Sequence, residues 1–160
     1  MRGPAHGAAE SRVGQTLATL YTDHYGPLVR MAALLTGDAG CADDVAADSF
    51  AALCSAGLVE AGDRALSYLR RQVVIRSRQA ARHHRVQGCG TPPRGFASLP
   101  VVLGLMKLRP AQREAVVLTG YLDLTEWQAA AAAGVSEKAL RRDLDTAMQM
   151  LRTGLLAGPP

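Results

Sequence analysis

Apolar side chains recur at helical spacing along most of the chain, which predicts an all-helical protein. The first apolar stripe spans residues 13–35, and we expect Gly26 and Pro27 to kink or break that helix. The residues before this stripe show no helical spacing of apolar side chains. Residues 1–12 are rich in Gly, Ala and Pro, and we expect them to form a disordered tail.

Two more helices are predicted in the N-terminal half. One runs from about residues 38–42 to Cys54, with aspartates lying off its apolar stripe. The other runs from about Arg64 to Arg85 and has two opposed faces, one apolar and one basic. The basic face is made of Arg71, Arg78, Arg82 and Arg85.

A Gly- and Pro-rich stretch divides the chain. Residues 87–98 lack apolar periodicity and read as a flexible linker. Residues 13–86 would then form one small helical domain and residues 99–155 a second, followed by a tail at residues 156–160.

The second domain carries helix-start and helix-stop signals. Pro110 suits a first helical position, and Thr125 and Ser136 can each cap a helix. Gly134 can supply the tight turn between those two helices. A helix, a short turn with Gly and a longer helix together predict a helix-turn-helix.

Charge is distributed unevenly. The net charge is only +4, but residues 38–63 hold six acids and no Lys or Arg, whereas residues 64–113 hold eleven basic residues and no acid. The acidic segment suits a basic partner and the basic one suits phosphates. Solvated acidic and basic faces are the alternative interpretation.

Other classes of protein find little support. We expect a cytoplasmic protein, because three cysteines cannot all pair and neither a signal peptide nor a membrane span is apparent. His83, His84 and Cys89 lack the spacing of a zinc site, so we expect no cofactor or metal. With no phosphate loop or catalytic triad pattern either, we expect no enzyme.

Three stretches, in order, resemble a known family. Residues 20–53, with the run TGDAGCADDVAADSF, resemble the polymerase-binding part of domain two of extracytoplasmic-function sigma factors. Residues 65–86 are similar to the basic helix that follows in actinobacterial members. Residues 108–152 resemble sigma domain four.

The resemblance implies a dissociable subunit that carries core RNA polymerase to promoters. It implies that Asp43, Asp44 and Asp48 bind the polymerase, and that the basic face of the third helix approaches promoter DNA. The last helix would read the major groove. Its DNA-facing residues would be Lys138, Arg141, Arg142 and Gln149. An anti-sigma factor or another transcription regulator would be a further partner.

The sequence departs from the family at DNA-facing positions. Gly57 stands near the position of the family's tryptophan, and Asp143 and Asp145 stand where Arg or Ser is usual. Ala129 and Ala133 replace large aliphatic residues. These departures motivate an alternative, a sigma-like regulator that binds polymerase or another transcription factor without reading a promoter itself. We expect Trp127 to pack within the domain, with exposure as a partner anchor as the alternative.

Overall fold

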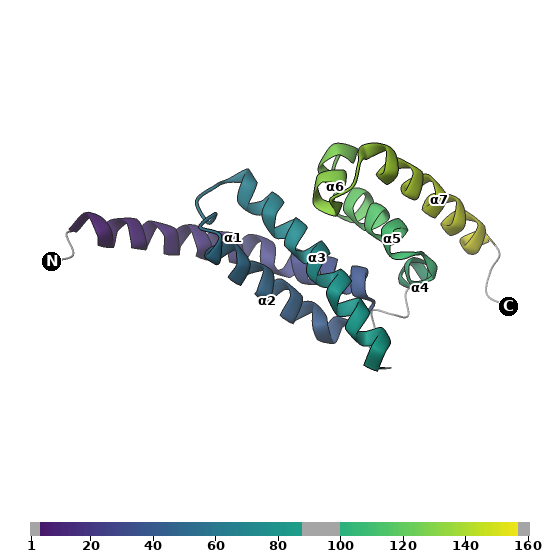
Figure 1. Ribbon diagram of the computed structural model, residues 1–160, viewed down its shortest axis with the longest axis horizontal. Coiled ribbons are helices and arrows are strands. Elements are labelled where there is room, and N and C mark those ends of the chain that lie inside the picture. The colour runs from purple at the N-terminus through teal and green to yellow at the C-terminus, as the bar shows by residue number, and fades with distance from the viewer. Residues whose placement is uncertain (1–3, 88–99, 157–160) are drawn as a thin grey trace.

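Every regular element in the described part of the chain is a helix, which confirms the all-helical prediction. The computed structural model describes residues 4–87 and 100–156. The first bundle consists of α1 (Pro4–Thr36), α2 (Ala39–Ser55) and α3 (Asp63–Gln87). The second consists of α4 (Pro100–Lys107), α5 (Pro110–Val116), the π-helix η1 (Val117–Tyr121), α6 (Glu126–Ala133) and α7 (Glu137–Leu156). Figure 1 shows the two bundles side by side.

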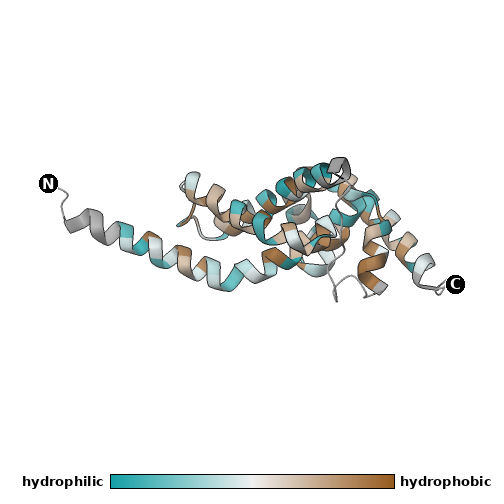
Figure 2. Cartoon of the chain, turned by 90° about the horizontal axis from the view of Figure 1, so that it is seen from below, coloured by the Kyte–Doolittle hydropathy of each residue, from teal (hydrophilic) through white to brown (hydrophobic). Residues whose placement is uncertain are grey.

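Helix α1 begins earlier than expected. Residues 4–12 are helical, so the prediction of a disordered tail is wrong for them. The reason is composition, because the alanines there favour a helix that continues into the apolar stripe from Val13. The N-terminal part of α1 projects past α2 and α3 (Figure 1). Pro27 lies inside α1, which bends along its length but does not end there (Figure 2).

Short-range signals placed most helix ends correctly. Asp38 Oδ1 accepts a hydrogen bond of 2.7 Å from the backbone two residues on and caps α2. Thr125 and Gln128 form a capping box at the start of α6. Gly134 adopts a left-handed φ of 70° between α6 and α7, and Ser136 Oγ accepts from a backbone N–H of α7 at 3.2 Å. These contacts confirm the predicted helix, turn and helix.

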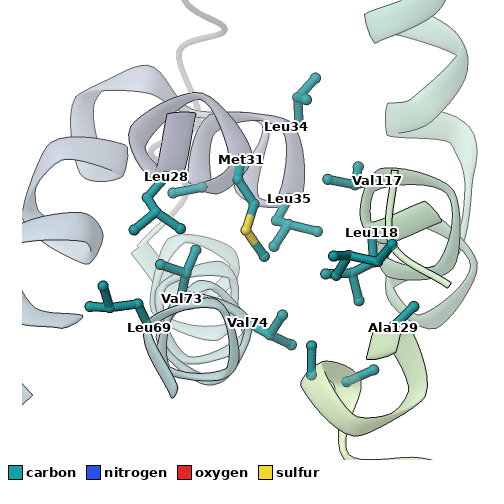
Figure 3. Packing of buried hydrophobic residues seen from close by; sticks show 14 of the residues in the cluster. Leu28, Met31, Leu34, Leu35, Leu69, Val73, Val74, Val117, Leu118 and Ala129 are labelled. Carbon is teal, nitrogen blue, oxygen red and sulfur yellow. The ribbon is translucent and has the colours of Figure 1, made fainter. Parts of the chain in front are cut away.

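The two bundles share one apolar core. Met31 and Leu35 of α1, Val74 of α3 and Leu118 of η1 belong to one buried cluster (Figure 3). Leu118 is fully buried, and Ala129 of α6 lies beside it on the same core. Burial of apolar surface therefore holds the bundles together as well as each bundle internally.

Some predictions concern residues outside the described part. Most of the linker at residues 87–98, Cys89 and the end of the C-terminal tail belong to this group. Within residues 4–87 and 100–156, none of the helices combines the length and apolar character that crossing a bilayer requires. The same ranges hold no group of three or more side chains suited to a metal ion.

Candidate polymerase-binding and nucleic-acid interfaces

An acidic surface lies on the outer side of α2. Its residues, Asp43, Asp44 and Asp48, are all exposed. The hydroxyl of Tyr25 donates a hydrogen bond to Asp43 Oδ1 at 2.9 Å, and Asp48 Oδ2 lies 3.7 Å from a guanidinium nitrogen of Arg76. Burial and the bond to Asp43 raise the pKa of Tyr25, so it stays a neutral donor. The surface thus presents carboxylates to solvent while α1 and α3 hold two of them in place.

An aromatic cluster fixes α2 against α1 beneath this surface. The rings of Tyr21 and Tyr25 stack with centroids 4.2 Å apart. Phe50 of α2 lies 5.3 Å and 5.9 Å from them. Such ring pairs add to the burial of apolar area, so the orientation of the acidic surface follows from well-packed neighbours.

The arginines of α3 do not form one open face. Arg71 and Arg82 are exposed, while the side chain of Arg85 lies outside the described residues. Arg78 instead turns to the second bundle. It donates from Nε and from a terminal nitrogen to the two carboxylate oxygens of Glu114, at 2.7 Å and 2.6 Å. Its terminal nitrogen also donates to the Ala133 carbonyl at 2.7 Å.

Sequence reasoning missed the role of Glu114. The side chain is only 8% exposed and lies on the buried side of α5 beside Gln112 and Ala115. Its hydrogen bonds raise the pKa of Arg78, so the guanidinium stays charged. A carboxylate at a buried helical position was the available signal, because such a group requires a partner.

The last helix keeps its predicted polar side in solvent. Its exposed DNA-facing candidates are Lys138, Arg141, Arg142 and Gln149. Arg141 nevertheless donates from Nε to Glu126 at 2.9 Å, with a second bond from a terminal nitrogen, and this lowers the pKa of the Glu126 carboxyl. Arg142 lies 3.8 Å from the mostly buried Asp143. Two of the four candidates, Arg141 and Arg142, therefore lie next to a carboxylate. Asp145 is also exposed on this helix.

The structure shows the surroundings of Trp127 and of Gly57. Trp127 is 60% exposed, so the prediction that it packs within the domain is wrong. The core side of α6 is formed by alanines, and Trp127 lies on the opposite side. Gly57 has a left-handed φ of 66° just after α2, a conformation that a tryptophan would adopt only with strain.

Known sigma-factor structures share this fold. No family model matches the chain, and no curated protein matches it. The sigma factor RpoE, solved with the anti-sigma factor NepR from Bartonella quintana, matches with a TM-score of 0.65 at 19% identity, over 89% of this chain and 98% of that one. CnrH, solved with the cytosolic domain of CnrY, matches with a TM-score of 0.68 at 24% identity, over 92% and 96%. The chain therefore has the fold of these proteins along nearly its whole length.

Proposed function

We propose that the protein is an extracytoplasmic-function sigma factor that binds core RNA polymerase and directs promoter-specific transcription initiation. The observation that carries the proposal is the exposed acidic surface of α2 in a chain with the fold of RpoE. The resemblance assigned polymerase binding to those three carboxylates, and all of them are open to solvent. No catalytic step belongs to this role.

The acidic surface would dock on a basic part of the polymerase. Complementary charge steers the encounter and fixes orientation, while each exposed pair adds only about 0.2–1 kcal/mol. Tyr25 and Arg76 hold Asp43 and Asp48, so less side-chain freedom is lost on docking. The three carboxylates would therefore bind together, and several of them must be neutralised to abolish polymerase binding.

DNA contacts would come from both bundles. Lys138, Arg142 and Gln149 are exposed on α7 and would face the major groove, while Arg71 and Arg82 would contact phosphates from α3. Each phosphate contact lowers affinity as salt rises, by about 0.9 in the slope of log K against log salt. RpoE and CnrH were each solved with a protein partner, so an anti-sigma factor is a further proposed partner.

Neutralising the acidic surface tests polymerase binding. In the full chain, the triple change Asp43→Asn, Asp44→Asn and Asp48→Asn should weaken binding to purified core polymerase by about tenfold, as expected for ~1.4 kcal/mol lost over three exposed pairs. The matched control is Asp23→Asn with Glu60→Gln, two exposed acids outside the surface. Equal binding by the triple variant and the control would refute the assignment of this surface.

Transcription tests promoter reading. Core polymerase with the wild-type chain should give defined transcripts from genomic DNA, and these should be lost with Lys138→Ala and Arg142→Ala. Gln15→Ala on the projecting part of α1 is the control. A chain that binds polymerase but yields no specific transcript from any promoter fails this part of the proposal.

The acids paired with DNA-facing cations favour a second candidate function. Glu126 engages Arg141, and Asp143 lies near Arg142, which leaves fewer cations for phosphates. A sigma-like regulator that binds polymerase or a transcription factor without reading a promoter would fit these contacts. Footprinting of the polymerase complex separates the two, because protection near position minus thirty-five is expected only for a promoter reader.

A further inference from the structure

The second bundle covers part of the α3 face that would approach DNA. Helix α6 packs against α3, and the Arg78 guanidinium lies between Glu114 and the C-terminal end of α6. Glu114 accepts with both oxygens, and its side chain is 8% exposed against 35% for Arg78. Arg78 therefore uses these hydrogen-bond donors for Glu114 and the Ala133 carbonyl, although part of its side chain reaches solvent, while α6 stays in place.

Contacts from α1 join the same two bundles. Arg113 donates to the Leu35 carbonyl near the end of α1 at 2.8 Å. Arg30 Nε donates to the hydroxyl of Tyr121 at 2.9 Å. The closed arrangement thus rests on polar contacts at both α1 and α3, around the shared core.

We propose that these contacts form an autoinhibitory latch, in which Glu114 competes with a DNA phosphate for Arg78. This proposal rests on the proposed function, because it concerns the regulation of the same DNA-binding face. A carboxylate and a phosphate both pair with a guanidinium through two parallel N–H···O bonds, so one excludes the other. DNA would bind α3 fully only after the bundles part and Arg78 leaves Glu114.

A population shift sets the size of the effect. If only a fraction of molecules is open, the apparent DNA affinity falls by that fraction. Opening also separates apolar surfaces around Leu35, Val74 and Leu118, so the closed state should predominate in the free chain. Weakening the latch should then raise DNA affinity in proportion to the open fraction.

Glu114→Gln in the full chain is the main test. The amide fills the same space without the negative charge that binds Arg78. Two readouts apply: the radius of gyration from X-ray scattering without DNA, and binding of a 30-base-pair duplex of random sequence. We expect a larger radius and about tenfold tighter DNA binding, as for a tenfold rise in the open fraction. The salt slope should steepen by about one phosphate contact.

Controls separate the latch from a general charge effect. Asp23→Asn removes an exposed acid from α1 and should change neither the radius of gyration nor the DNA affinity. Adding Arg78→Ala to Glu114→Gln should keep the larger radius but return the salt slope to its wild-type value, because the added phosphate contact is that of Arg78. Unchanged radius and affinity in Glu114→Gln, or a steeper salt slope that survives Arg78→Ala, overturns the proposal.

If Glu114→Gln does not fold, a milder variant can test the latch. Tyr121→Phe removes only an exposed hydroxyl that bonds Arg30, and we expect about threefold tighter DNA binding with an intact circular dichroism spectrum. If Tyr121→Phe changes neither the radius nor DNA affinity, the latch is refuted. Polymerase binding is measured separately through the α2 surface. If Glu114→Gln opens the latch but the wild-type chain does not bind polymerase, the proposed function is refuted and the latch is not.

Discussion

Leu118→Ala tests the packing that both bundles share. Leu118 is fully buried in η1, with Leu35 of α1 and Ala129 of α6 around it (Figure 3). Because these neighbours lie on separate helices, we expect the surrounding structure to close only part of the space that the side chain leaves. We expect the free energy of unfolding to fall by about 3 kcal/mol, near the lower end for such cavity-forming changes. For a chain of this length that lowers the melting temperature by roughly 6–12 °C.

Urea unfolding followed by circular dichroism at 222 nm measures this loss. Leu103→Ala is the matched control, because Leu103 is 51% exposed and the change should stay within about 0.5 kcal/mol. Amide hydrogen exchange should show the lost protection first in α5, η1 and α7. A loss below about 1 kcal/mol for Leu118→Ala would mean that the site relaxes or is not buried, and the described core would be wrong.

Three further predictions concern the helix-turn-helix. Gly134→Ala should cost about 1–2 kcal/mol in thermal unfolding, because Gly134 has a φ of 70°, and no loss would contradict that backbone. Thr125→Ala should cost about 1 kcal/mol by removing the cap of α6, with exposed Thr19→Ala as the control; equal stabilities would argue against the cap. Arg141 lowers the pKa of Glu126, so the stabilisation by this pair is present above the ordinary glutamate pKa of about 4.3 and is lost as pH falls through the lowered value. Glu126→Gln should remove this part of the acid dependence of melting, and parallel pH profiles would contradict the ion pair.

Local patterns predicted most of the helices. Thr125 and Ser136 cap helices because a short polar side chain meets free backbone N–H groups within a few residues. Gly134 ends α6 because glycine adopts a left-handed φ without strain. All of these signals act between residues close in sequence, which is why the sequence alone was sufficient for them.

Contacts between distant residues were the part that sequence could not supply. Arg78 and Glu114 are 36 positions apart, and no helical period indicates that they meet. Periodicity separates an apolar side of α3 from a basic side, but it cannot say that α6 covers part of the basic side. The same limit applies to Trp127, whose exposure depends on which side of α6 the other helices occupy.

Alanines form the buried side of α6, the helix that packs against α3. Ala129 and Ala133 stand where the sigma pattern usually has large aliphatics, and both are buried. Methyl groups keep α6 thin on that side, which allows the Ala133 carbonyl to reach Arg78. A leucine at either alanine position would require more space and would push α6 away from its neighbours. Side-chain volume in one short helix, as much as charge, would thus determine how readily the two halves of the chain come apart.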